Sequence, residues 1–120
     1  MLSVSRAVKI YLYNDAADLR CGYDGLAAIV QNQMKDDPLS GALYLFLNRR
    51  RNRIKLLYWD DDGYVIWMKR LEVGSFELPR PTDSEVSHVR ITASQLALIL
   101  DGIELSSVRR RRRYQLRPVG

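Results

Sequence analysis

Residues 53–79 read RIKLLYWDDDGYVIWMKRLEVGSFELP, and this stretch decides what kind of fold the chain adopts. Two apolar, aromatic-rich runs flank the polar residues 60–63, which is the pattern of a β-hairpin. Gly63 is expected to supply the positive φ of a short hairpin loop with a bulge, while the aspartates solvate the turn. The β-branched and aromatic side chains of both runs suit a pleated surface. The stretch therefore predicts two antiparallel strands joined by a tight turn.

The segments before the hairpin predict two further strands and a helix. Residues 8–13 alternate well enough for a half-buried strand, and residues 42–47 form a short apolar run typical of a buried strand. Between them, Asp24 is a candidate N-cap for a helix that extends to about Gln33, because apolar residues recur there at a spacing of three to four.

The segments after the hairpin predict one more strand and one more helix. Residues 85–91 carry three apolar side chains at strand-like positions. Thr92 and Gln95 have the spacing of a capping box, in which threonine accepts a hydrogen bond from the backbone and glutamine returns one. This box is expected to open a helix over residues 93–100.

Together these elements predict a small α+β domain. Consecutive strands joined by short loops are antiparallel, so we expect an antiparallel sheet of four to five strands in a meander. The two helices are expected to pack on one face of this sheet. The domain is assigned to residues 1–107, and residues 108–120 are expected to form an Arg-rich, flexible C-terminal tail.

The distribution of charge supports this division. The chain has 120 residues, 47% of them apolar and 28% charged, as in ordinary folded domains, and its net charge is +5. Residues 108–120 contain six arginines and no acid. Removing these six from the 19 basic residues leaves 13, against 14 acidic residues, so residues 1–107 are close to neutral.

Residue types that support catalysis or metal binding are scarce. His88 and Cys21 are the only histidine and cysteine, which excludes an intrachain disulfide and, in practice, a structural zinc site. The aspartates at 60–62 are typical of a turn, because neighbouring carboxylates in a tight turn point apart instead of converging on a metal. No phosphate-binding glycine motif is present. We therefore expect no metal, no cofactor and no enzymatic activity.

The sequence also predicts where the protein resides. No apolar run approaches the roughly 20 residues that span a bilayer. The first residues lack the apolar core and the cleavage site of a secretory signal. We expect a soluble, cytoplasmic protein that does not engage a membrane.

Basic residues gather at the base of the hairpin, opposite the aspartates. Like charges placed opposite one another in a sheet cost a few tenths of a kcal/mol per pair, so an anionic partner is one way to compensate them. The alternative is that the lysine and arginine stems cover apolar edges while their charges stay in water. The candidate nucleic-acid-binding residues at this end and in the tail are Arg49, Arg50, Arg51, Arg53, Lys55, Lys69, Arg70, Arg109, Arg110, Arg111, Arg112 and Arg113.

The same hairpin resembles a known family. The run RIKLLYWDDDGY at residues 53–64 is similar to the small accessory proteins of insertion-sequence-66-type bacterial transposons, often labelled TnpB. The resemblance covers roughly residues 10–105 in the family's order. Cys21 and Asn52 depart from it, since a basic and an acidic residue are common there. The other matching motifs are KRLEVGSFELP at 69–79, DLRCGYDGL at 18–26, DPLSG at 37–41 and QLALILDGI at 95–103.

The resemblance implies a role in DNA transposition beside a separate, much larger transposase. Combined with the basic hairpin, it predicts a non-catalytic accessory factor that contacts DNA, with the ends of the element as the expected target and the tail as an auxiliary arm. The alternative is a protein interaction module without nucleic-acid contact, which docks on the transposase or associates with a second copy. For this alternative, the aromatic side chains of the hairpin are in excess of one small core, and Trp59 and Trp67 are the candidate partner-binding residues.

Overall fold

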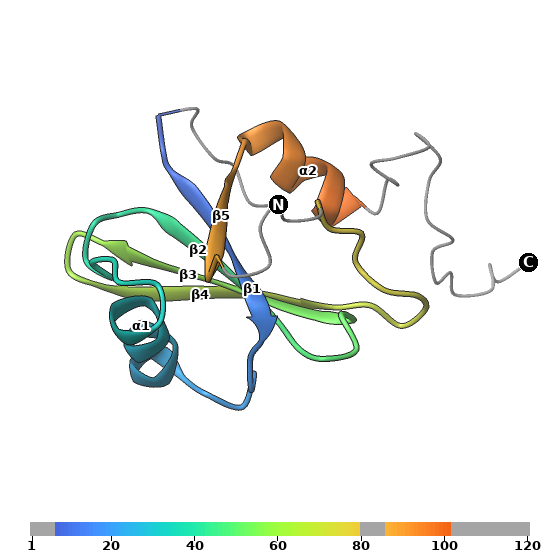
Figure 1. Ribbon diagram of the computed structural model, residues 1–120, viewed down its shortest axis with the longest axis horizontal. Helices are drawn as coiled ribbons and strands as arrows, with labels where there is room; N and C mark the ends of the chain where they lie inside the picture. Colours follow the sequence, from blue (N-terminus) through green and yellow to red (C-terminus); the bar gives the residue numbers. More distant parts are fainter. Residues whose placement is uncertain (1–6, 80–85, 102–120) are drawn as a thin grey trace, which may run out of the picture.

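A computed structural model describes residues 7–79 and 86–101 of the chain. These residues form one five-stranded sheet and two helices, which confirms the predicted α+β class (Figure 1). The elements in chain order are β1 (Ile10–Ala16), α1 (Tyr23–Asn32), β2 (Leu43–Leu47), β3 (Arg53–Asp60), β4 (Gly63–Arg70), β5 (His88–Ile91) and α2 (Ala93–Asp101).

The order of strands in the sheet is β4-β3-β2-β1-β5, and this order corrects the predicted meander. The sheet is mostly antiparallel, but β1 and β2 pair in parallel. The chain between them, which includes α1, is long enough to carry β2 back to the end where β1 began, as a parallel pair requires. The last strand, β5, then pairs with β1 instead of extending the sheet beyond β4.

The predicted hairpin is confirmed, although its turn differs in detail. β3 and β4 are paired along their whole length, from Arg53 opposite Arg70 to Asp60 opposite Gly63. The positive φ lies at Asp61, at 53°, and not at Gly63, which is already part of β4. A short polar side chain makes aspartate one of the few residues besides glycine that accept this left-handed conformation.

The helices lie on opposite faces of the sheet, so the prediction that both pack on one face is wrong (Figure 1). The alternating side chains of β2 show the two layers. Leu45 belongs to the cluster that α2 covers, together with Leu96, whereas Phe46 belongs to the cluster that α1 covers, together with Leu26. Every residue of β2 is buried, because both of its faces have a helical layer to pack against.

The two helices begin differently. The capping box of α2 is confirmed: the Gln95 backbone N–H donates to the Thr92 hydroxyl at 3.0 Å, and the Thr92 backbone N–H donates to the Gln95 side chain at 2.9 Å. In α1 the N-cap is Gly22, without a side-chain hydrogen bond, and Asp24 lies inside the first turn. Its carboxylate is there favourably placed toward the positive end of the helix dipole.

The double-sided core predicts that neighbouring residues of β3 contribute equally to stability. Leu56 faces α2 and Leu57 faces α1, and both are fully buried. Each change, Leu56→Ala or Leu57→Ala, should lower the free energy of unfolding by about 2–5 kcal/mol, measured by urea denaturation. Met68→Ala, at a side chain that is 65% exposed, is the control and should change it by less than about 0.5 kcal/mol. A small effect of either leucine variant would contradict the two-layer arrangement.

Candidate nucleic-acid interface

The turn that leads from β2 into β3 is held by Asn48. Its side-chain carbonyl oxygen accepts the backbone N–H of Asn52 at 3.1 Å and that of Arg53 at 3.0 Å. Its side-chain N–H₂ donates to the Asn52 side chain at 2.7 Å, and its backbone carbonyl accepts the Arg51 N–H at 3.0 Å. One asparagine thus satisfies most of the polar backbone of this turn, as side chains of this type commonly do.

Arg51 occupies the left-handed backbone region in this turn, with φ at 57°. This conformation is unfavourable for a residue with a Cβ atom, and neighbouring structure must hold it. The fully buried Phe76 supplies part of that hold, because its backbone N–H donates to the Arg51 carbonyl at 2.7 Å. The Leu71 N–H donates to the adjacent Asn52 carbonyl, also at 2.7 Å. The arginine-bearing turn is therefore braced by the segment that follows β4.

Four arginines project from this braced turn into solvent: Arg49, Arg50, Arg51 and Arg53. The ion pairs found among the described residues involve none of them. The carboxylate of Asp15 lines a hollow of about 110 Å³ together with Tyr13, Arg49 and Arg51. Partial burial and then the charge of Asp15 raise the pKa of Tyr13, so its hydroxyl remains a hydrogen-bond donor at neutral pH.

Arg70 joins this group across the hairpin. It lies directly opposite Arg53, so their side chains emerge on the same face of the sheet. Arg70 is paired with Glu72, with a guanidinium-to-carboxylate distance of 2.8 Å, and both side chains are about half exposed. This pair of arginines therefore carries two positive charges against one carboxylate.

The two lysines of the predicted set lie elsewhere. Lys69 points to the opposite face, where its ammonium donates to the Leu100 carbonyl at 2.9 Å, near the negative end of the α2 dipole. Lys55 shares the face of Arg53, but its ammonium donates to the Cys21 carbonyl at 3.1 Å. The expectation that the basic residues at the base of the hairpin all gather together is thus corrected, since the alternation of a strand sends Lys69 to the face opposite Arg70.

Lys55 also contributes to the electrostatics of the loop before α1. Hydrogen bonds from Arg20 are the main reason that the pKa of Asp18 falls to about 2, and the charge of Lys55 adds a small part. Asp18 therefore stays ionised throughout the physiological range. The ammonium of Lys55 is accordingly placed to hold this loop against the sheet.

The two tryptophans predicted to bind a partner are partly buried on different faces. Trp67 packs against the core cluster on the α2 side. Trp59 packs edge-on against Tyr64, with ring centroids 5.1 Å apart. The reasoning that one face of the sheet lacks a cover does not hold, because α1 and α2 cover one face each. Both rings have a structural role that does not depend on a partner.

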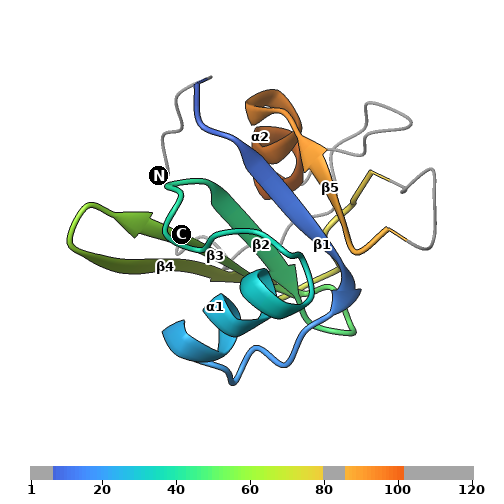
Figure 2. The same ribbon diagram turned by 60° about the vertical axis from the view of Figure 1, so that its left-hand side comes forward.

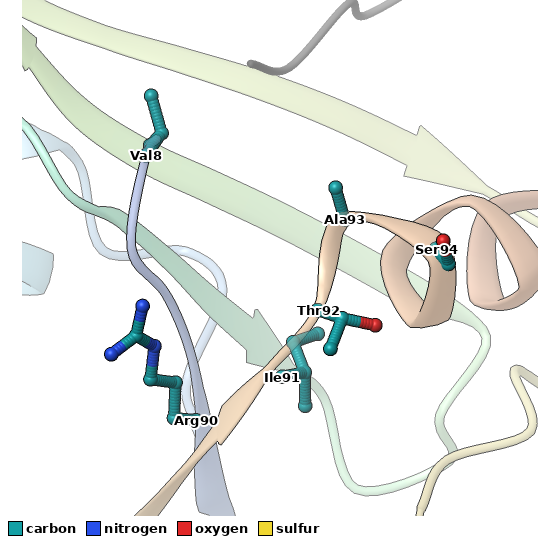
Figure 3. A pocket seen from close by; sticks show the side chains of 6 residues that line it. All are labelled: Val8, Arg90, Ile91, Thr92, Ala93 and Ser94. Carbon is teal, nitrogen blue, oxygen red and sulfur yellow. The ribbon is translucent and has the colours of Figure 1, made fainter. Parts of the chain in front are cut away.

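A larger hollow, of about 560 Å³, lies where β5 meets α2 (Figure 3). The described residues that line it are Val8 and the run from Arg90 to Ser94, and Arg90 is the one charged side chain among them. None of these six described side chains is a carboxylate, histidine or cysteine that could act as acid, base or nucleophile. Among residues 7–79 and 86–101, no group of three His, Cys, Asp or Glu side chains is placed to hold a metal ion.

Sequence reasoning missed two features of this interface. Asn48 carries a signal that could have revealed it, because asparagine before a basic, polar segment is typical of a side-chain-stabilised turn. Glu72 carries no such signal, since its pairing with Arg70 depends on how the chain bends after β4. The predicted residues Arg109, Arg110, Arg111, Arg112 and Arg113 lie outside the described residues.

Comparisons with known proteins identify relatives of this chain. A Sinorhizobium fredii (strain NBRC 101917 / NGR234) protein named "Uncharacterized protein y4hO" is 33% identical over 104 residues, covering 87% of this chain and 88% of the relative. A second protein of that strain, "Uncharacterized protein y4jC", is 29% identical over 111 residues, covering 92% of both. No solved structure matches. Neither of the two described helices, α1 and α2, has the length and apolar character of a membrane-spanning segment.

The family comparison agrees with the resemblance seen in the hairpin motifs. The model of the family described as IS66 Orf2 like protein matches residues 8–110, which include both helices and all five strands. The chain therefore belongs to the IS66 Orf2-like (TnpB) family of transposon-associated accessory proteins.

Proposed function

We propose that the protein is a non-catalytic accessory factor in the transposition of an IS66-type element, and that it contacts the DNA of the element directly. The contact is assigned to a basic surface that consists of Arg49, Arg50, Arg51 and Arg53, with Arg70 at its border. The observation that carries this proposal is the set of four exposed arginines, without ion pairs among the described residues, on one hydrogen-bonded turn.

The rigidity of the turn supports a binding role. Ordering a flexible segment on binding costs free energy, and that cost is reduced when the backbone is already held. Here Asn48 and the Phe76 N–H hold the backbone that carries the arginines. Guanidinium groups suit phosphate oxygens because they donate two parallel hydrogen bonds. A cluster of this kind binds the DNA backbone and is largely indifferent to base sequence.

The basic surface includes fewer residues than the hairpin sequence suggests. Lys55 and Lys69 are directed to backbone carbonyls and contribute to it only at longer range. The arginines of the tail, Arg109 to Arg113, are proposed as an auxiliary arm that adds further phosphate contacts. The transposase remains a candidate partner of the alternative function, in which the chain acts through protein contacts alone.

One prediction of this proposal concerns the salt dependence of DNA binding. Replacing Arg49, Arg50 and Arg51 together with serine should weaken binding to a duplex. Because each lost phosphate contact lowers the slope of log K against log salt by about 0.9, the slope should fall by about 2–3. The measurement is a fluorescence anisotropy titration with element termini and with unrelated duplex, repeated across ionic strengths.

A matched control separates this surface from net charge. Replacing Lys9, Lys35 and Arg90 with serine removes the same three positive charges, but at exposed positions away from the turn. The tail is intact in both variants. The control should retain most of the affinity and of the salt slope. Equal losses in the two variants, or an unchanged slope in the turn variant, would refute the assignment of the contact to the basic surface.

Another prediction uses the backbone of Arg51. Arg51→Gly relieves the left-handed conformation and should raise the free energy of unfolding by about 0.5–1 kcal/mol, while DNA binding weakens by the loss of one phosphate contact. Arg50→Gly is the control, because its φ is not positive. That variant should lose a similar amount of binding and a few tenths of a kcal/mol of stability. Parallel urea denaturation and anisotropy measurements check both, and weaker stability of Arg51→Gly would contradict the strain argument.

A further inference from the structure

β4 is the outermost strand on one side of the sheet, next to β3 only (Figure 2). Within the described part of the chain, no other strand pairs with its outer edge. It is eight residues long, whereas β5 at the other edge has four. An unpaired edge of this length presents a row of backbone donors and acceptors to any strand of matching pattern.

The hydrogen-bond pattern identifies which residues face outward. The Leu71 N–H donates to the Asn52 carbonyl, so residues 71 and 52 form a hydrogen-bonded pair at the base of the hairpin. In an antiparallel ladder such pairs alternate with non-bonded ones, which assigns Lys69, Trp67 and Val65 to bonds with β3. The backbone N–H and C=O groups of Tyr64, Ile66 and Met68 therefore point away from β3.

The side chains along this edge do not protect it. Residues 64–68 are Tyr, Val, Ile, Trp and Met, and none of these five is fully buried. Met68 is 65% exposed, the largest value among the exposed large apolar residues of the described chain. Edge strands that avoid pairing usually carry a charge, a proline or a bulge near their centre. The five central residues of β4 have no charge and no proline, and its pairing with β3 is regular.

We propose that a second copy of this chain pairs with β4, antiparallel and edge to edge, about a two-fold axis at Ile66. This register places Ile66 opposite Ile66 of the second copy and Tyr64 opposite Met68 of the second copy. Each outward backbone group then meets an outward group of the partner, as a hydrogen-bonded ladder requires. The two five-stranded sheets join into one continuous sheet, and the apolar residues 64–68 of the two copies become cross-strand neighbours.

The charges at the two ends of β4 select this register. In this register Asp62, the turn residue directly before β4, lies next to Arg70 of the second copy. There the carboxylate complements the Arg53–Arg70 pair, for which Glu72 is the one acidic ion-pair partner among the described residues. A shift of two residues in one direction would place Asp62 opposite Glu72, and a shift in the other direction would place it opposite Met68. Charge complementarity thus favours a second copy over an unrelated strand.

This association does not depend on DNA contact, and its test is independent of DNA binding. Sedimentation equilibrium of the full chain from micromolar to millimolar concentration should show a monomer–dimer equilibrium. A monomer at all concentrations, or a larger open assembly, would overturn the proposal.

A cysteine pair tests the register directly. In a Cys21→Ser background, Ile66→Cys should form a disulfide-linked dimer under mild oxidation. A hydrogen-bonded antiparallel pair has Cα atoms about 5.5 Å apart, which lies within disulfide range. Met68→Cys is the control: its side chain is more exposed, yet its counterpart is Tyr64, so it should form little disulfide. Faster cross-linking at position 68 than at position 66 would overturn the register.

A charge exchange tests the same register at exposed positions. Arg70→Glu should raise the dimer dissociation constant about tenfold, because two symmetric contacts become repulsive. Adding Asp62→Arg in the same chain should restore the dimer, since each new arginine lies opposite a new glutamate. Circular dichroism confirms that each variant is folded. Failure of the double variant to recover association would refute the pairing of Asp62 with Arg70.

Discussion

The structure depends on the burial of β2 from both sides. Its five side chains alternate between two apolar clusters, one beneath α1 and one beneath α2, and every one of them is buried. Apolar burial is the largest favourable contribution to folding. A central strand with two covered faces buries the side chains of both faces, so all of its residues add to this contribution. The parallel pairing of β1 with β2 follows from the same constraint, because the crossover between them delivers α1 to one face. α2, at the other end of the chain, then covers the second face.

The basic surface is a consequence of this central position. β2 ends inside the core, and the chain must reverse at once to form β3, so its next residues emerge at the end of the sheet. Asn48 makes the reversal compact, and the segment after β4 braces it through the N–H groups of Leu71 and Phe76. This compact turn places Arg51 in the unfavourable left-handed backbone conformation. A turn that needed only to reverse the chain would favour glycine or asparagine there, which is why the arginine suggests a role in binding.

The two proposals use different parts of the hairpin. DNA contact is assigned to side chains at its base, whereas self-association is assigned to the backbone edge and apolar side chains of β4. Arg70 and Arg53 connect the two, because they lie opposite each other where the strand edge meets the basic surface. A second copy that supplies a carboxylate to this pair would change the potential at the border of the basic surface, while Arg49, Arg50 and Arg51 stay exposed.

The sequence by itself determined the local elements: the hairpin and its pairing, the capping box of α2, the buried run of β2, and the family. Each depends on neighbouring residues, whose periodicity and turn chemistry are visible in the chain. The tertiary structure alone decided the strand order, the opposite placement of the helices, and the separation of Lys69 from Arg70 into different surroundings. Those features depend on contacts between distant segments, such as Lys69 with the end of α2 and Phe76 with Arg51. A one-dimensional pattern contains no distances between such segments, because loop length permits several ways to cover the same apolar strand.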